Sequence, residues 1–310
     1  MPNPYCKNLR TIIFDIETMG LMSYKDMVIN AGFCDPETGD CFQLFAESKQ
    51  DEERLIRDIY EILSHYEVVI TYNGNRFDIP FIKARAKKYG IDGFPFFWSL
   101  DLYRYFKKYW PLAERMEHLN QKSVEIALGL SEDRDDKIGG GECIPLYEHY
   151  LCYKDEESKQ LILLHNADDV KQLAKIYNAA NFLPYDKISF EQGFGVPAKK
   201  YVICESMRLD KNYLYIKAKT TAGGLPCSIY EDSYEIEYDS FSGCIEIKIL
   251  LYNKDGLCFV DLSKLPVNIN EFKELKGYHS DYLVLKGRSS LMYQEINCLA
   301  SSILSNEDLF

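Results

Sequence analysis

The sequence predicts an α/β protein in which a mixed sheet flanked by helices is followed by a smaller, mainly β region. Over residues 1–183, short β-branched runs alternate with segments of helical spacing, as in α/β domains. From residue 184 the pattern changes to short strands and turns, and it ends in a helix. At 310 residues the chain exceeds the usual single domain. We therefore expect two domains, residues 1–183 and 184–310.

The strand order of the first domain follows from its connections. Residues 11–14 indicate a buried strand, and residues 27–34 and 41–47 predict two more, joined by a turn, so the three form an antiparallel meander. After a helix over 51–66, the strand 68–71 is expected parallel beside the first. Further helices are expected near residues 78–89, 123–130, 155–180 and 290–304, and strands of the second domain near 201–209, 212–220, 233–238, 244–251, 257–262 and 282–285.

Charge and cysteine content exclude several classes of protein. A net charge of −12 argues against a histone-like binder, but it is compatible with an enzyme acting on a polyanion, because bound metal can reverse the local sign. No apolar run reaches membrane-spanning length and the N-terminus lacks a signal-peptide core, so we expect a soluble, cytoplasmic protein without membrane contact. Ten cysteines without a C-x-x-C pair indicate neither a zinc ribbon nor a disulfide framework, and we expect them to be reduced.

Basic and aromatic residues gather in two stretches that allow two interpretations. The basic side chains are Lys83, Arg85, Lys87 and Lys88 in one stretch, and Arg104, Lys107 and Lys108 in the other. The second stretch, residues 94–110, is also rich in aromatics. Such side chains suit base stacking and phosphate contact, but they equally suit solvated helix faces and core packing.

The first strand ends in two acids, Asp15 and Glu17. Alternation along a strand places both on one face, roughly 7 Å apart. Two carboxylates at the end of a core strand repel each other and resist desolvation, and a hard divalent cation such as Mg²⁺ relieves both costs. The alternative is that both acids lie at a solvated strand end.

A third acid follows the strand 68–71. The Asn73–Gly74 turn leads into a helix that begins at about Asp78. The helix dipole favours a carboxylate there, so an ordinary N-terminal cap is one interpretation. The other is that Asp78 lies beside Asp15 and Glu17, because the two preceding strands are expected to be neighbours.

The helix over residues 155–180 carries His165 and Asp169 within its apolar stripe. A histidine and an aspartate in a core-facing stripe are costly to bury unless they face a polar site. Their spacing of four makes the side chains neighbours, so His165 could act beside a metal ion bound by Asp169. Asp168 points about 100° away and is expected to face solvent.

Three segments together resemble the DEDD superfamily of 3′–5′ exonucleases, and most of all its YprB-type ribonuclease H-like family. They are Phe14-Asp15-Ile16-Glu17-Thr18, residues 71–80 with the sequence TYNGNRFDIP, and His165-Asn166-Ala167-Asp168-Asp169-Val170. The likeness covers about residues 8–180. In the histidine-containing branch of the superfamily the histidine and final aspartate are usually five apart; here they are four apart, a spacing that the YprB-like pattern accommodates.

The resemblance implies a ribonuclease H-like fold and phosphodiester hydrolysis with two ions, Mg²⁺ or Mn²⁺. By this resemblance, Asp15, Glu17 and Asp169 hold the ion that activates water, and Asp15 bridges to a second ion completed by Asp78. His165 is the expected general base. Asn73, Thr18 and Phe77 are the expected substrate contacts.

The leading hypothesis is a metal-dependent nuclease, most simply a 3′–5′ exonuclease acting on single-stranded ends. An endonuclease is a variant of it. The alternative is a non-catalytic nucleic-acid-binding or scaffold protein that retains the fold. No motif distinguishes DNA from RNA, since that choice depends on contacts to the 2′-hydroxyl. The sequence likewise carries no signal for oligomeric state or for the role of residues 184–310.

Overall fold

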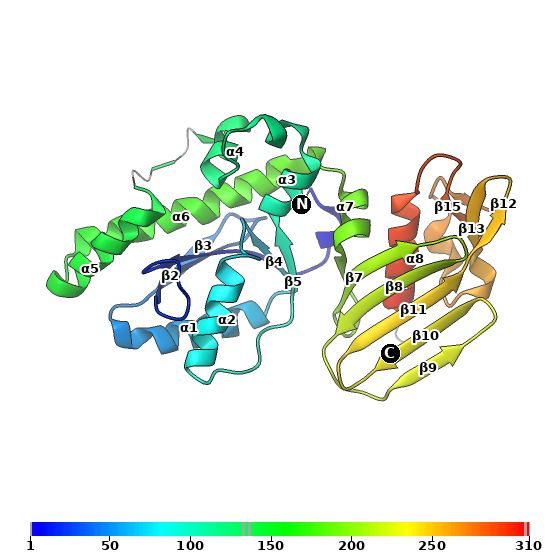
Figure 1. Ribbon diagram of the computed structural model, residues 1–310, viewed down its shortest axis with the longest axis horizontal. Coiled ribbons are helices and arrows are strands. Elements are labelled where there is room, and N and C mark those ends of the chain that lie inside the picture. The colour runs from blue at the N-terminus through cyan, green and yellow to red at the C-terminus, as the bar shows by residue number, and fades with distance from the viewer. Residues whose placement is uncertain (1, 132–133, 136–137, 307–308, 310) are drawn as a thin grey trace. The chain divides into compact units, whose positions relative to one another are not determined.

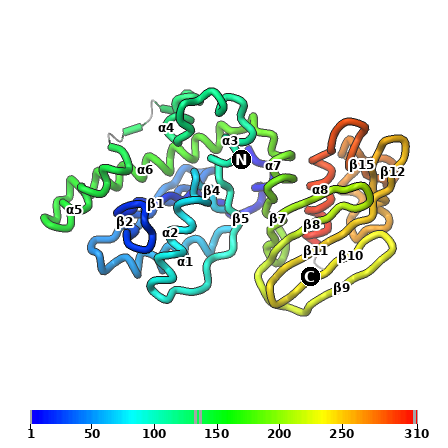
Figure 2. Tube along the Cα trace, in the orientation of Figure 1, coloured from blue at the N-terminus to red at the C-terminus, as the bar shows by residue number. Residues whose placement is uncertain are grey.

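The chain divides into two compact units, Met1–Leu183 and Pro184–Phe310 (Figure 1). The computed structural model describes residues 2–131, 134–135, 138–306 and 309, and Figure 2 traces their path. Among these described residues, no helix combines the length and the apolar character needed to cross a bilayer.

The first unit contains a five-stranded mixed sheet in the order β3-β2-β1-β4-β5. Its strands are β1 (Thr11–Thr18), β2 (Val28–Cys34), β3 (Cys41–Phe45), β4 (Val68–Thr71) and β5 (Trp98–Asp101). β2 pairs antiparallel with both β1 and β3, whereas β4 pairs parallel with both β1 and β5. The predicted meander and the parallel position of β4 are therefore confirmed, while β5 was not predicted.

Helices cover both faces of this sheet. The α-helices of the unit are α1 (Glu52–Ser64), α2 (Asp78–Lys88), α3 (Leu102–Tyr109), α4 (Gln121–Ala127), α5 (Cys143–Tyr153) and α6 (Glu156–Ala179), and α4 packs against α6. α6 runs along one face of the sheet, and α1 and α2 lie on the opposite face (Figure 1). The apolar stripe of α1, with Leu55, Ile59 and Leu63, is buried in the core. This arrangement confirms the predicted α/β class.

The basic and aromatic stretches are divided between core and surface. Trp98, Tyr105 and Phe106 are buried, so these aromatics pack in the core. Arg85 is also buried, because it forms an ion pair with Glu52 of α1. Arg85 therefore belongs neither to a solvated helix face nor to a phosphate-binding surface. The other basic side chains of both stretches are exposed.

The cysteine expectation was wrong at one pair. Cys34 and Cys41 form a disulfide between β2 and β3. The two residues are direct partners in the antiparallel register, which brings their side chains together on one face of the hairpin. A spacing of seven residues across a turn carries no cysteine motif, so the sequence pattern gave no sign of it.

The second unit is mainly β, as predicted. Its six-stranded antiparallel sheet has the order β6-β7-β8-β11-β10-β9, and a smaller sheet has the order β12-β13-β15-β14. The strands are β6 (Phe194–Val196), β7 (Val202–Leu209), β8 (Tyr213–Thr220), β9 (Cys227–Tyr230), β10 (Tyr234–Asp239), β11 (Cys244–Leu250), β12 (Tyr252–Lys254), β13 (Leu257–Asp261), β14 (Tyr278–His279) and β15 (Tyr282–Lys286). α8 (Tyr293–Leu304) is the expected final helix, whereas α7 (Tyr185–Gln192) was not predicted.

Candidate metal-dependent active site

Asp15 lies in β1 opposite Gly32 of β2, and its carboxylate is oriented by α6. Asn166 donates from Nδ2 to Oδ2 of Asp15 at 2.9 Å, and Gln43 donates to Oδ1 of Asn166 at 2.8 Å. A Cβ at position 32 would lie 2.2 Å from that Asn166 oxygen, so only glycine allows the amide to reach Asp15. No local sequence pattern marks this support for Asp15.

Asp78 is the first residue of α2, and its Oδ1 accepts the backbone N–H of Ile16 at 3.1 Å. The loop before it is ordered by Asp101, at the end of β5. The Asp101 carboxylate accepts the N–H groups of Asn73 and Asn75 at 2.8 and 3.2 Å. The parallel strands β4 and β1 thus bring Asp78 to the same end of the sheet as Asp15, as the strand order predicted.

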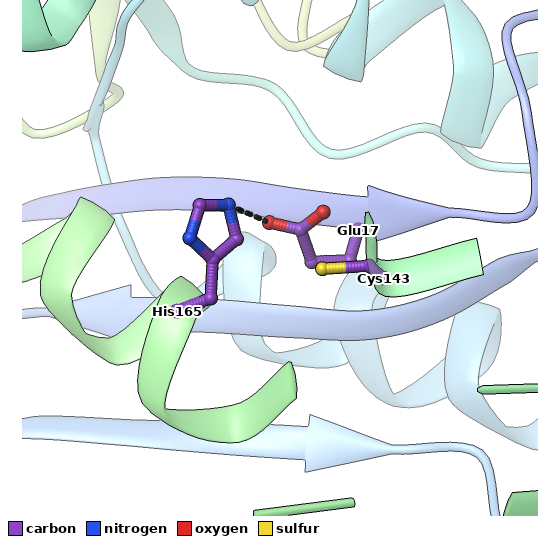
Figure 3. A group of neighbouring side chains, drawn as sticks. All are labelled: Glu17, Cys143 and His165. Atoms are coloured by element: carbon purple, nitrogen blue, oxygen red, sulfur yellow. Dashed lines mark ion pairs between the residues drawn. The ribbon is translucent and has the colours of Figure 1, made fainter. Parts of the chain in front are cut away.

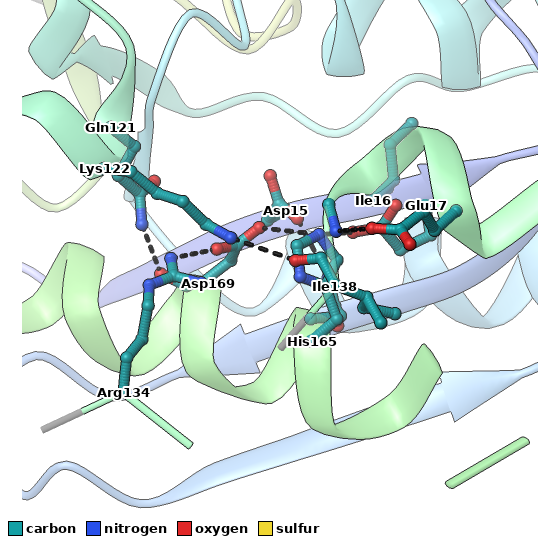
Figure 4. Close-up of polar contacts among 12 residues, drawn as sticks. Asp15, Ile16, Glu17, Gln121, Lys122, Arg134, Ile138, His165 and Asp169 are labelled. Carbon is teal, nitrogen blue, oxygen red and sulfur yellow. Dashed lines mark hydrogen bonds and ion pairs between the residues drawn. The ribbon is translucent and has the colours of Figure 1, made fainter. Parts of the chain in front are cut away.

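His165 and Asp169 project from α6 toward β1 (Figure 4). Nε2 of His165 lies 3.5 Å from Oδ2 of Asp169 and 3.6 Å from Oε1 of Glu17. One carboxylate oxygen from each of Asp15, Glu17 and Asp169 lies within 4.8 Å of the others. Residues far apart in the chain therefore converge on one small volume.

The crowding of acids changes their protonation. Burial, followed by repulsion from Asp78, Asp169 and Glu17, raises the pKa of Asp15 well above its usual range. Burial likewise raises the pKa of Asp78 to about 7, although backbone hydrogen bonds partly oppose the shift. Oxygen-only ligands at this spacing fit a hard divalent cation, which would neutralise the charges that the fold places together.

The expectation for Asp168 was wrong. Its side chain is buried, with an exposed fraction of 3%, and it accepts the N–H of Asp135 at 2.8 Å. Asp135 contacts this side of α6, so the face that helical geometry points away from the sheet is not solvated at Asp168. Asp169 is the more exposed of the two and lines the central cavity.

The acids open into a cavity of about 410 Å³. Its lining includes the four acids, His165, and two of the expected substrate contacts, Asn73 and Phe77. Thr18 does not line this cavity, because its hydroxyl donates to the carbonyl of Gly20 at 2.7 Å and closes the turn after β1. An adjoining hollow of about 540 Å³ shares Tyr72, Asn73, Asn120 and Gln121 with the cavity.

Arg134 and Glu125 form a second contact with the site that the sequence did not predict. Glu125 of α4 is buried and accepts from Nε and Nη2 of Arg134 at 2.9 and 3.1 Å. The same guanidinium forms an ion pair with Asp169 (Figure 4). Gln121 donates to Oε1 of Glu125 at 3.1 Å and to the carbonyl oxygen of Asp169 at 2.9 Å. This network fixes Asp169 from the side away from β1, and no local pattern marks its members.

A mixed sheet with acids gathered at the ends of β1 and β4 and on the covering helix defines the class of this unit as a ribonuclease H-like nuclease fold. The sequence model of the RNase H superfamily matches residues 12–181, and the chain belongs to that superfamily.

Two similar proteins are DNA polymerases. A DNA polymerase of Methanocaldococcus jannaschii is 37% identical over 94 residues, which are 27% of this chain and 6% of that protein. The structure of the family B DNA polymerase of Pyrobaculum calidifontis is similar over 67% of this chain and 34% of that chain, with 17% identity and a TM-score of 0.45. The matched regions thus span only a small part of the first relative and about a third of the second.

Proposed function

We propose that this protein is a DEDD-type 3′–5′ exonuclease that hydrolyses phosphodiester bonds at single-stranded nucleic-acid ends. The observation that carries the proposal is the convergence of carboxylate oxygens from Asp15, Glu17 and Asp169 within 4.8 Å, with the imidazole of His165 beside two of them. Membership of the RNase H superfamily and the similarity to a DNA polymerase support it further.

The acids have the donor chemistry that divalent cations require. Bound through Asp15, Glu17, Asp78 and Asp169, two Mg²⁺ or Mn²⁺ ions would activate the attacking water and stabilise the leaving oxygen. Asn166 keeps the Asp15 carboxylate oriented, and Arg134 does so for Asp169. These neighbours fix the donor atoms before any cation arrives, which lowers the cost of binding one.

His165 is the general base in this proposal. Its Nε2 faces Glu17 and Asp169, so a water bound among these acids would lie within reach of the imidazole. An imidazole accepts a proton effectively near neutral pH. The two nearby carboxylates also stabilise the imidazolium that forms when the proton is transferred.

The lining of the cavity suits one end of a flexible strand. Phe77 offers an apolar surface, Lys122 a cationic one and Asn73 a polar one, and the adjoining hollow continues past Tyr72. Aromatic rings stack on bases of any sequence, while a lysine contacts phosphate. This combination supports a single-stranded substrate and carries no preference between DNA and RNA.

A cleavage assay with end-labelled nucleic acids tests this proposal. Single- and double-stranded DNA and RNA, each labelled at the 5′ end, are incubated with the purified chain in Mn²⁺, in Mg²⁺ or in EDTA. A ladder of 5′-labelled products shortened from the 3′ end, present with metal and absent in EDTA, is expected on single strands. Products of internal cleavage would show that the protein is an endonuclease and not an exonuclease. No cleavage in either metal, with binding retained and unaffected by Asp15→Ala, would instead indicate a non-catalytic binding or scaffold protein.

A further inference from the structure

A second group of possible metal ligands lies within the cavity wall, and it contains sulfur. Cys143 begins α5 and lies beside Glu17 and His165 (Figure 3). One donor atom from each of the three residues lies within 4.8 Å of the others, and all three residues are buried. No role in the proposed hydrolysis falls to Cys143, so its position in this group calls for another explanation.

The three donors match the preferences of Zn²⁺ rather than those of Mg²⁺. Thiolate, imidazole and carboxylate are the usual zinc ligands, whereas Mg²⁺ favours oxygen alone. Bonds of about 2.0 to 2.3 Å in a tetrahedron place ligand atoms roughly 3.3 to 3.8 Å apart. Nε2 of His165 and Oε1 of Glu17 are already 3.6 Å apart.

The surroundings of the sulfur favour its ionised form once a cation is present. Cys143 is the first residue of an eleven-residue helix, where the backbone dipole stabilises negative charge. Without a cation, burial and the charge of Glu17 raise the pKa of the thiol, so metal binding must displace its proton. Glu17, His165 and Gly140 also line the cavity, which lets a water reach the fourth ligand position.

We propose that Glu17, Cys143 and His165 form a Zn²⁺ site that overlaps the oxygen-only ligand set of Asp15, Glu17 and Asp169 but differs from it in its donors. The two sets share Glu17, so one carboxylate cannot serve both fully. A zinc ion bound here also occupies the nitrogen of His165 that faces the acids. Zinc therefore inhibits cleavage, and this consequence alone rests on the proposed function, whereas the binding site does not.

Cobalt titration tests the site without any measurement of activity. Co²⁺ added to the metal-free full chain is expected to give, at one equivalent, the visible absorption of a tetrahedral ion together with a thiolate-to-cobalt charge-transfer band. Cys143→Ser is expected to abolish the charge-transfer band. The matched control is Cys152→Ser, which removes an exposed thiol from the same helix and should leave the band intact.

Zinc affinity measured by competition with a coloured chelator gives the second readout. Cys143→Ser, Glu17→Gln and His165→Gln are each expected to weaken Zn²⁺ binding at least tenfold, while Cys152→Ser leaves it unchanged. Testing three ligands keeps the result independent of how well any one variant folds, which circular dichroism monitors. A missing charge-transfer band, a band unaffected by Cys143→Ser, or equal zinc affinity in all four variants would each overturn the proposal.

The inhibitory consequence has its own measurement. Zn²⁺ titrated into a Mn²⁺-supported cleavage reaction is expected to inhibit, and Cys143→Ser is expected to raise the half-inhibitory zinc concentration at least tenfold. If the wild-type chain does not cleave nucleic acid at all but shows the charge-transfer band, the zinc site stands and the proposed exonuclease fails. Equal zinc sensitivity of the wild type and Cys143→Ser would refute the inhibition through this site.

Discussion

Two buried groups of charge in the first unit are built in opposite ways. Glu52 of α1 is surrounded by donors: Nε and Nη2 of Arg85 at 2.6 and 2.5 Å, the hydroxyl of Tyr89 at 2.5 Å and the N–H of Val28 at 2.9 Å. Every acceptor position of this carboxylate has a partner from the chain itself. The ion pair of Glu52 with Arg85 joins α1 to α2, and its charges neutralise each other.

Asp15, Asp78 and Asp169 of the cavity each have a different kind of partner among the described residues. Asp15 receives an amide from Asn166, Asp78 a backbone N–H, and Asp169 a share of Arg134. Burial, followed by repulsion from the neighbouring acids, raises the pKa of Asp15, the opposite of what a structural ion pair produces. The comparison teaches that the charge of Glu52 is neutralised within the chain, whereas the crowding of carboxylates in the cavity is the feature on which the proposed cation site depends.

The largest expected effect on activity comes from Asp15→Asn, which keeps the shape of the side chain and removes its charge. Cleavage in Mn²⁺ should fall on the order of 10³-fold, or about 4 kcal/mol, because the proposed two-ion site would lose the ligand that its ions share. The stability of the metal-free protein should rise, because repulsion among the acids is relieved. Initial rates on a labelled single strand and urea unfolding in EDTA measure the two quantities.

The matched control for this experiment is Asp92→Asn, an exposed acid in the loop after α2. It should change neither rate nor stability. A decrease in both quantities for Asp15→Asn would show that Asp15 is a structural charge like Glu52, and the contrast between the two groups would disappear.

Glu52→Ala should cost about 3 to 5 kcal/mol of unfolding free energy, because it leaves the guanidinium of Arg85 buried without its partner. The double replacement Glu52→Leu with Arg85→Met should recover most of that loss, since no buried charge remains. Urea unfolding of the wild type, Glu52→Leu, Arg85→Met and the double variant forms a complete cycle. An additive double variant would mean that the two residues do not act as a pair.

The effect of Asp78→Asn on stability is expected to depend on pH. Folding raises the pKa of Asp78 from 3.8 to about 7, so the metal-free folded chain binds this proton more tightly than the unfolded chain. The associated stability is complete below about pH 4 and is lost as pH rises through 7. In EDTA, Asp78→Asn should therefore stabilise the protein at pH 8, by at most about 4 kcal/mol at about 1.4 kcal/mol per unit, and have little effect at pH 4. Equal effects at both pH values would show that folding does not raise the pKa of Asp78.

The smallest expected effect belongs to Asn166→Ala, which removes the orienting amide and no charge. The Mn²⁺ concentration for half-maximal cleavage should rise about tenfold, since the groups that position metal ligands contribute this much to affinity. Asn178→Ala is the control on the same helix, because its amide donates to the carbonyl of Pro36 instead. If Asn166→Ala and Asn178→Ala require the same Mn²⁺ concentration for half-maximal cleavage, Asn166 does not position Asp15 for metal binding.

The sequence predicted those parts of the site that local patterns encode. Asp15 and Glu17 follow from strand alternation, Asp78 from the turn after β4, and His165 with Asp169 from polar residues in an apolar stripe. The neighbouring positions of β1 and β4 followed from the helix between them. These features brought the chemistry-bearing residues together without any knowledge of side-chain contacts.

The residues that were missed act across long separations. The hydrogen bond from Asn166 to Asp15 joins positions 151 apart, and Arg134 reaches Asp169 from 35 residues away. No periodicity signals such contacts. Asp168 was misplaced for a related reason: helical geometry gives the direction of a side chain but not which segment covers it. The cross-strand disulfide of Cys34 and Cys41 depends in the same way on register.

The lack of a side chain at Gly32 determines how closely α6 can approach the sheet beside the cavity. A methyl group there would meet Asn166 and also Val170, whose Cγ1 would lie 3.0 Å away. Both residues belong to the helix that carries His165 and Asp169, so a bulkier residue would push that helix, with its imidazole and carboxylate, outward from the strand. The absence of a side chain at position 32 therefore sets the distance between β1 and α6. A larger residue there would increase this distance without changing any of the acids or His165.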